Sequence, residues 1–483
     1  MTARETALLD ATAQAELVRS GEVTAAELVG WAIERIERLN PLLNAIVTPL
    51  HEAAAAAAAA LARPSGPFAG VAYLLKDLVA EAAGTPFTEG SRFLAGFVSD
   101  RDCELVRRQR RAGLVLVGKA NTPEFGMVPT VEPLLHGPTR NPWATDRSTS
   151  GSSGASAAAV AAGLVPVAHG NDLAGSLRFP ASACGVFGLK PTRARNPLGP
   201  EYGDVVGGWA TEHALTRSVR DSAALLDATC GPAPGDPYPA PPPERPFAAE
   251  VGADPGRLRI AWTARTPGGG QGHPDCVAAL HDAVALCEAL GHDLVEAELP
   301  GLDERVGHAI GTVFHATTAW IVRYWIRRTG REPGPDDLEP LTRHYLEKGQ
   351  QVGAADYLLA VEELQRFART VADFLTGHDL WLTPTMSTPP APLGAITAAP
   401  DDPLRALRHG AATVQYPLVV ANITGGAAMS VPLWWNAEGL PIGVHFLGRP
   451  GGEAVLLRLA AQLEAARPWG NRLPPVHAST ELE

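Results

Sequence analysis

Two serines in glycine-rich stretches are the residues of this chain best suited to chemistry. Ser152 lies in residues 150–156, and Ser176 lies 24 positions further along, in residues 170–180. An apolar run over 157–169 separates the two stretches and is too compact to be a linker. This arrangement predicts an enzyme in which one hydroxyl attacks a substrate and another moves a proton.

A serine nucleophile needs a positioned base, and Lys76 is the candidate. None of the fourteen histidines lies in a local triad signature such as Gly-x-Ser-x-Gly. Lys76 follows the apolar run 70–75, which predicts a buried strand that ends at the lysine. Burial would lower the pKa of Lys76 toward neutrality and make its amine a base. On local sequence alone, a strand-edge lysine with its ammonium group in water is the more ordinary interpretation.

The glycine-rich stretches themselves have two interpretations. By composition, residues 148–156 resemble a flexible linker. They also lead directly into an alanine-rich helix predicted over 155–162, whose N-terminus would direct backbone N–H groups toward the serines. In the second stretch, residues 172–176 also suit an oxyanion hole, because the small residues Ala174 and Gly175 allow successive N–H groups to converge on a developing negative charge.

The composition is that of an ordinary globular protein. The 483 residues are 46% hydrophobic and 19% charged, with a formal net charge of -12, so we expect no nucleic-acid partner. The five cysteines show no paired spacing, and no Cys-x-x-Cys or His-x-x-x-His occurs, so we expect no disulfide framework, metal or cofactor. No signal-peptide or membrane-length apolar run is found, which predicts a cytoplasmic protein without membrane contact.

The order of elements predicts an α/β fold. Helical patterns cover residues 10–39, 53–60, 103–112, 155–162, 276–290, much of 305–375, and 453–466. Short apolar runs predict strands at 70–75, 113–118, 164–168, 258–262, 293–299, 380–385 and 443–447. We therefore expect one large α/β/α domain over 1–483, with a mixed, mostly parallel twisted sheet covered by helices.

This single domain divides into four expected segments. A catalytic core with N-terminal helices spans 8–230, and a surface loop with eight prolines spans 232–246. An α/β and helical insertion at the substrate cleft spans 247–375, and the C-terminal part of the core spans 376–483.

Four groups of residues resemble the amidase-signature family. They are Leu-Leu-Lys-Asp-Leu at 74–78, Gly-Lys-Ala-Asn-Thr-Pro-Glu at 118–124, the serine-bearing segment 151–192, and Gly-Leu-Pro-Ile-Gly-Val at 439–444. The likeness runs from about residue 8 to 469. Shorter strings at 10–22, 66–70 and 168–172 resemble one subgroup, the aminohexanoate cyclic-dimer (nylon-oligomer) hydrolases and similar bacterial amidases.

The resemblance implies the amidase-signature fold and a division of labour among the candidate residues. Ser176 would be the nucleophile that forms the acyl-enzyme, Ser152 the bridging serine, usually on a cis peptide bond, and Lys76 the base. The proton would pass from Ser176 through Ser152 to the neutral lysine, and Ser152 would protonate the leaving amine. The oxyanion would be held by the backbone N–H groups of Leu173, Ala174, Gly175 and Ser176.

Two motifs depart from the family pattern. Residues 171–176 read Asn-Asp-Leu-Ala-Gly-Ser where the family usually has Thr-Asp-x-Gly-Gly-Ser, and 150–155 read Ser-Gly-Ser-Ser-Gly-Ala where Gly-Gly-Ser-Ser-Gly-Gly is usual. Ala174 adds a methyl group beside the expected oxyanion hole. That methyl is tolerated if the φ angle of Ala174 is negative and is costly if the turn needs a positive φ.

Further residues are expected around the substrate or beneath it. The expected substrate-binding residues are Phe125, Gly126, Met127, Ser153, His315, Trp320 and Asn422. His315 and Trp320 belong to an aromatic stripe over 314–325, which is either a core face or a wall of the cleft. Asp172 and Arg178 are expected to pair beneath the catalytic turn and to orient it.

These features predict an amidohydrolase that cleaves a small, uncharged or aryl carboxamide, linear or cyclic, through a seryl acyl-enzyme. Three alternatives stay open: a carbamate or ester hydrolase, a glutamine amidotransferase subunit of a larger complex, and an inactive relative that only binds ligand. The expected partner is a small-molecule amide, and formation of a homodimer is left open.

Overall fold

A mixed eleven-stranded sheet runs through the protein in the computed structural model, which describes residues 1–61 and 65–481. The strand order is β1-β3-β2-β6-β8-β7-β12-β13-β11-β9-β10. The strands are β1 Ile46–Pro49, β2 Ala72–Lys76, β3 Val115–Ala120, β6 Val167–Asp172, β7 Phe187–Lys190, β8 Thr211–Thr216, β9 Arg259–Trp262, β10 Asp293–Glu296, β11 Leu380–Pro384, β12 Ala428–Trp435 and β13 Pro441–Leu447. β4 Arg140–Asn141 and β5 Ala144–Ser148 form a separate ribbon.

The directions of the strands correct one detail of the expected fold. The α/β class and the mixed sheet are confirmed, but the prediction of a mostly parallel sheet is wrong. Of the ten neighbouring pairs described in the large sheet, four are parallel (β2–β3, β2–β6, β9–β10 and β9–β11) and six are antiparallel. One central antiparallel pair, β12–β13, is a hairpin across residues 436–440, whereas others, such as β7–β12 and β11–β13, join strands that are far apart in sequence.

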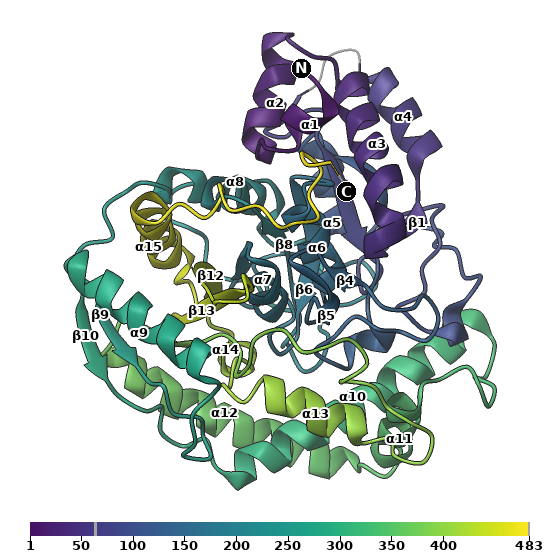
Figure 1. Cartoon of the computed structure of the whole chain (residues 1–483). Helices are drawn as coiled ribbons and strands as arrows, with labels where there is room; N and C mark the ends of the chain where they lie inside the picture. The colour runs from purple at the N-terminus through teal and green to yellow at the C-terminus, as the bar shows by residue number, and fades with distance from the viewer. Residues whose placement is uncertain (62–64, 482–483) are drawn as a thin grey trace.

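Some helices pack along this sheet, and others, α10 to α13, form a long helical layer beside it (Figure 1). The N-terminal group is α1 Ala3–Thr6, α2 Ala11–Ser20, α3 Ala25–Leu43 and α4 His51–Ala60. The middle group is α5 Glu104–Arg111, α6 Gly154–Ala161, α7 Arg178–Cys184, α8 Val219–Thr229 and α9 Pro274–Ala289. The remaining helices are α10 Glu304–Thr329, α11 Pro340–Gly349, α12 Ala354–Thr376, α13 Arg405–Thr413, α14 Val420–Thr424 and α15 Glu453–Ala466.

The alanine-rich helix α6 explains the composition of the first glycine-rich stretch. All eight of its residues are buried, and it packs against α7 and against β2, β6 and β8. A Cβ atom on Gly154 would lie 2.2 Å from Thr149 Oγ1. Only small side chains fit at this depth, so the helix interpretation is confirmed and the linker interpretation is wrong.

Strand β6 differs from its predicted position by three residues at the start and four at the end. The strand was expected over 164–168, but it spans Val167–Asp172. Pro166 precedes its first residue, and residues 167–172 pair with β8 along their whole length. This longer strand carries Asn171 and Asp172 to the edge of the sheet, next to the second serine.

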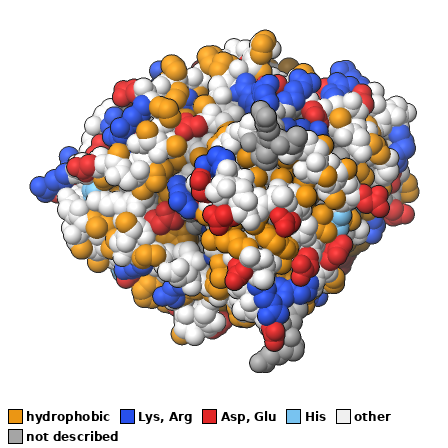
Figure 2. All heavy atoms as spheres, turned by 90° about the horizontal axis from the view of Figure 1, so that it is seen from above, with side chains coloured by type: hydrophobic (Ala, Val, Ile, Leu, Met, Phe, Trp, Pro, Cys, Tyr) orange, Lys and Arg blue, Asp and Glu red, His pale blue; other side chains and the backbone are white. Residues whose placement is uncertain are grey.

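The described residues contain no helix long and apolar enough to cross a membrane. In the same part of the chain, no group of three or more His, Cys, Asp or Glu side chains is arranged to hold a metal ion. Figure 2 shows acidic and basic side chains scattered among apolar ones over the upper face of the molecule.

The close packing of α10 on α11 is tested by Gly349→Ala. The new Cβ would lie 1.9 Å from the carbonyl oxygen of His315, so α11 must shift and stability should fall by about 1–3 kcal/mol. Gly307→Ala is the matched control, because this exposed glycine of α10 has no atom within 4 Å of an added Cβ. We expect a lower apparent Tm for the first variant and an unchanged or higher Tm for the second. Equal Tm values would contradict this packing.

Candidate active site

Three segments meet where the parallel strands β2 and β6 end. Lys76 is the last residue of β2, and Asp172 is the last residue of β6. Ser152 lies in the turn before α6, on a cis Gly151–Ser152 peptide bond. Ser176 lies in the turn between β6 and α7, which we call the nucleophile turn (residues 173–177). Parallel strands bring their carboxyl ends to one edge, which is where such sites form.

The amine of Lys76 is completely buried among oxygen atoms. Its Nζ lies 2.7 Å from Ser152 Oγ, 3.0 Å from Ser153 Oγ and 2.6 Å from Asn171 Oδ1. Burial lowers the pKa of Lys76 from 10.5 to about 7, against the smaller opposing effect of the Glu212 and Asp172 carboxylates. A large fraction of the amine is therefore neutral near pH 7 and can accept a proton.

The partners of Lys76 determine which way each hydrogen bond runs. Asn171 Nδ2 donates to the Leu78 carbonyl at 3.0 Å, so Asn171 Oδ1 is an acceptor. Ser153 Oγ donates to the Asn171 carbonyl at 3.1 Å, so it also accepts from Lys76. A neutral amine has two N–H groups and one lone pair. Because Asn171 and Ser153 take the two N–H groups, the lone pair faces Ser152.

The hydroxyl of Ser176 lies at the wall of a cavity. Ser176 is 9% exposed and is among the residues that line this space. In the described chain its Oγ makes no hydrogen bond, and none joins it to Ser152 Oγ. The two glycine-rich stretches are instead linked by the Ser153 N–H, which donates to the Ser176 carbonyl at 3.2 Å. Gly126 also borders Ser152, since a Cβ there would lie 3.3 Å from Ser152 Oγ.

The nucleophile turn presents three free backbone N–H groups, one fewer than the four expected. The Gly175 N–H donates to Asp172 Oδ1 at 2.7 Å and is already engaged. The N–H groups of Leu173, Ala174 and Ser176 have no acceptor among the described residues, and all three residues line the cavity. Gly175 has a φ angle of 132°, whereas Ala174 is not among the positive-φ residues. The methyl group of Ala174 is therefore compatible with the turn.

A buried ion pair holds this turn from beneath. Arg178 donates to both oxygens of Asp172 at 2.9 Å, and Asn422 Nδ2 donates to Asp172 Oδ1 at 2.9 Å. Burial alone would raise the pKa of Asp172, but the Arg178 guanidinium, together with Lys190 and the Asn422 hydrogen bond, holds the pKa below its usual range. The second Asp172 oxygen also accepts from the Leu177 N–H at 3.1 Å. Asp172 is thus an ionised anchor for the turn.

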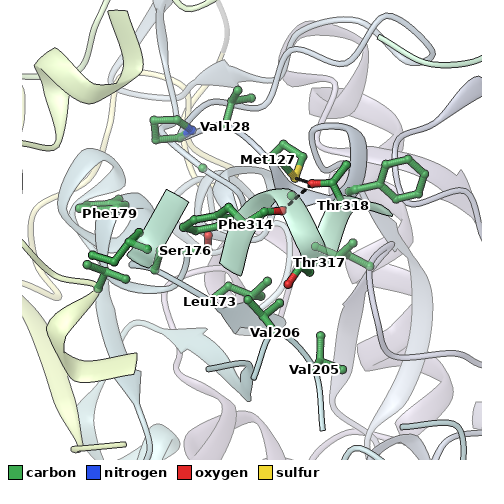
Figure 3. A pocket seen from close by; sticks show the side chains of 18 of the residues that line it. Met127, Val128, Leu173, Ser176, Phe179, Val205, Val206, Phe314, Thr317 and Thr318 are labelled. Carbon is green, nitrogen blue, oxygen red and sulfur yellow. Dashed lines mark hydrogen bonds between the residues drawn. The ribbon is translucent and has the colours of Figure 1, made fainter. Parts of the chain in front are cut away.

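The cavity beside Ser176 has a volume of about 270 Å³ and a largely apolar lining. Figure 3 shows Leu173 and Ser176 of the nucleophile turn and Phe314, Thr317 and Thr318 of α10 around it. Among the residues expected to bind substrate, Phe125, Gly126, Met127 and Trp320 line the cavity.

The other three expected binding residues lie elsewhere. Ser153 contacts Lys76, and Asn422 contacts Asp172 and Arg178. His315 faces α11, where its ring meets Tyr345 edge-on with a centroid distance of 4.8 Å. The aromatic stripe of α10 therefore contributes Phe314 and Trp320 to the cavity but not His315.

Three residues near the site were not predicted from sequence. Asn171 was noted only as a departure from the family motif. Glu212 reaches the site because β8 pairs with β6, where it binds His169 and stands 3.4 Å from Asn171 Nδ2. Glu89 lines the cavity, and no local pattern indicated it.

A cavity-facing serine, free backbone N–H groups and a buried amine form a site of the serine-hydrolase type. Comparisons with known proteins agree with this class. The Amidase family profile matches residues 27–457. A 6-aminohexanoate-cyclic-dimer hydrolase of Pseudomonas sp. (strain NK87) is 42% identical over 476 residues, 96% of each chain.

Solved structures give the same result. The structure of a 6-aminohexanoate cyclic dimer hydrolase complexed with substrate has a TM-score of 0.92 at 40% identity, covering 97% of this chain and 99% of that chain. A bacterial aryl acylamidase of the amidase signature family has a TM-score of 0.86 at 25% identity, covering 97% and 98%. The chain belongs to the amidase signature family, and it is an amidase.

The geometry of the nucleophile turn is tested by exchanging its two small residues in turn. Gly175→Ala would place a Cβ 2.2 Å from the Phe179 ring at a φ of 132°, so the turn must distort. We expect its kcat for amide hydrolysis to fall by about 100-fold, the loss typical of a disturbed oxyanion donor. Ala174→Gly removes a tolerated methyl group and should change kcat little. Equal losses in the two variants would contradict the proposed turn geometry.

Proposed function

We propose that the chain hydrolyses a small, uncharged amide through an acyl-enzyme on Ser176, with Ser152 relaying protons to and from Lys76. The contact that carries this proposal is the 2.7 Å approach of Lys76 Nζ to Ser152 Oγ. Because Ser153 and Asn171 hold the two N–H groups of the neutral amine, its lone pair is left for the Ser152 proton.

The first half of the reaction forms the tetrahedral intermediate on Ser176, from which the acyl-enzyme arises when the C–N bond breaks. Ser176 Oγ bonds to the carbonyl carbon while its proton passes to Ser152 Oγ, and the Ser152 proton passes to Lys76. Negative charge develops on the carbonyl oxygen, which the free N–H groups of the nucleophile turn can stabilise. The Glu212 and Asp172 carboxylates favour the ammonium form of Lys76 and so stabilise the protonated intermediate.

The second half returns the proton and releases the products. Lys76 gives its proton to Ser152, which protonates the leaving nitrogen as the C–N bond breaks. Water then attacks the Ser176 ester, and its proton follows the same relay in the same direction as in acylation. The carboxylic acid leaves, and Ser176 regains its proton from Ser152.

The cavity favours an apolar, uncharged substrate. Phe125, Phe314 and Trp320 supply aromatic surface, and no lysine or arginine is among the described lining residues. Glutamine would bring a free carboxylate that finds no cation there, which speaks against the amidotransferase alternative. The relatives' names, a cyclic-dimer hydrolase and an aryl acylamidase, support cyclic or aryl amides as substrates. Esters and carbamates of similar shape suit the same machinery.

The assignment of the nucleophile is tested by intact-mass spectrometry during turnover of an aryl amide. The wild-type chain should gain the mass of the acyl group, and Ser176→Ala should gain none while remaining folded. Ser152→Ala keeps the nucleophile but loses the relay, so we expect acylation about 100-fold slower or more. An acyl adduct on Ser176→Ala would refute the assignment.

The protonation state of the base is tested by the pH dependence of kcat/KM for a simple alkyl anilide. Below the pKa of Lys76, about 7, kcat/KM should rise about tenfold per pH unit, because only the neutral amine accepts a proton. Above that pH it should level off. Asp172 stays ionised throughout this range, since its pKa is lowered. A profile that is flat between mildly acidic and alkaline pH would count against a lysine base.

A further inference from the structure

Glu89 is a buried carboxyl group in the wall of the substrate cavity, and the mechanism above does not use it. Its exposure is 1%, and it lines the same cavity as Ser176. Trp325 Nε1 donates to Glu89 Oε2 at 2.8 Å, and the Val79 N–H donates to Oε1 at 3.3 Å. In the described structure no lysine, arginine or histidine forms a salt bridge with it.

Two nearby carboxylates, unlike Glu89, each have a cationic partner. Asp77 is paired with Lys119 at 2.6 Å, and Glu81 accepts from Arg328 at 2.8 Å. A buried carboxylate without such a partner is costly. Burial, with a smaller effect of the negative charges of Glu81 and Asp77, raises the pKa of Glu89 to about 8. In the free enzyme at pH 7 this group is therefore mostly a neutral carboxylic acid.

The backbone around Glu89 is strained in a way that places its side chain at the cavity. Glu89, Val79 and Phe125 have φ angles of 48°, 65° and 50°, a region that side-chain-bearing residues rarely adopt. Two hydrogen bonds join them: Val79 N–H to the Glu89 carboxyl, and Phe125 N–H to the Glu89 carbonyl at 2.8 Å. All three residues line the cavity. Such strain is typical of ligand-binding sites, where the surroundings hold it.

The carboxyl group has unused hydrogen-bonding capacity. A neutral carboxylic acid has one O–H donor and acceptor sites on both oxygens. The Trp325 and Val79 contacts use one acceptor site on each oxygen, and the O–H has no acceptor among the described residues. The neighbouring lining is apolar, including Val205, Val206 and Ile321. A few polar groups in an apolar pocket usually fix the orientation of the ligand.

We propose that Glu89 hydrogen-bonds a second, neutral amide group of the substrate, separate from the amide that Ser176 attacks. The inference deepens the proposed function and rests on it. A secondary amide offers one N–H and one C=O, which match the donor and acceptor sites of the acid. A substrate ammonium group would instead create a buried ion pair, which requires desolvation of two charges in an apolar cavity.

Two matched substrates separate this role from a structural one. The first is the p-nitroanilide of N-acetyl-6-aminohexanoic acid, whose acyl chain carries a second amide. The second is the p-nitroanilide of an unbranched fatty acid of equal chain length, which has no second amide. Both release the same chromophore, so kcat and KM are measured in one assay for wild type and for each variant.

The variants are Glu89→Leu, which removes the polar group, and Glu89→Gln, which keeps a neutral donor and acceptor. We expect Glu89→Leu to lower kcat/KM for the diamide about tenfold more than for the alkyl anilide, mainly through KM, as one lost hydrogen bond implies. Glu89→Gln should retain most of the preference for the diamide. Trp325→Phe removes only the indole donor, so it should affect both substrates alike.

Three results would overturn the inference in different ways. If Glu89→Leu lowers kcat/KM equally for both substrates, Glu89 is structural only. If Glu89→Gln loses the preference as fully as Glu89→Leu, and wild type prefers an amine-tipped anilide, the site binds an ammonium group. If wild type hydrolyses neither anilide and forms no acyl-enzyme, the proposed function fails and the inference fails with it.

Discussion

The burial of the Lys76 amine is the physical constraint on which the rest of the site depends. Away from water the ammonium form is disfavoured, and among the described residues no carboxylate is in direct contact with the amine to favour that form. The amine is therefore a base near neutral pH, and two fixed acceptors aim its lone pair at Ser152. The closed space around it requires the parallel β2–β6 pair and the small residues of α6, since larger side chains would not fit.

Arg178, a second buried cationic side chain, keeps its charge, in contrast to Lys76. Arg178 is as deeply buried as Lys76, but it donates to both Asp172 oxygens and forms an ionic anchor. Asp172 in turn binds the Gly175 and Leu177 N–H groups and so fixes the nucleophile turn. The Arg178–Asp172 pair keeps its charges and positions the backbone, while the unpaired lysine loses its charge near neutral pH and, in the proposed mechanism, transfers protons. Both outcomes follow from whether a carboxylate is in contact.

Local patterns were enough to predict much of this structure. The closing helix was expected over 453–466 and has those bounds, and the strand before Lys76 ends where it was predicted to end. These features depend on residues that are close in sequence. The pairing of strands that are distant in sequence does not depend on such local patterns. The antiparallel centre of the sheet and the position of Glu212 beside the site therefore could not be predicted. Likewise, helical spacing placed His315 on the right helix, but only tertiary packing turned its ring to α11.

The state of the Lys76 amine can be measured directly, because the chain contains four lysines: Lys76, Lys119, Lys190 and Lys348. Selective ¹³C labelling of the lysine Cε atoms should give four NMR signals, of which Lys76→Met removes one. Lys190→Met assigns the other lysine whose pKa burial lowers to about 7. The account predicts that the Lys76 signal of the free enzyme titrates near pH 7. A signal that remains that of an ammonium group above pH 9 would contradict it.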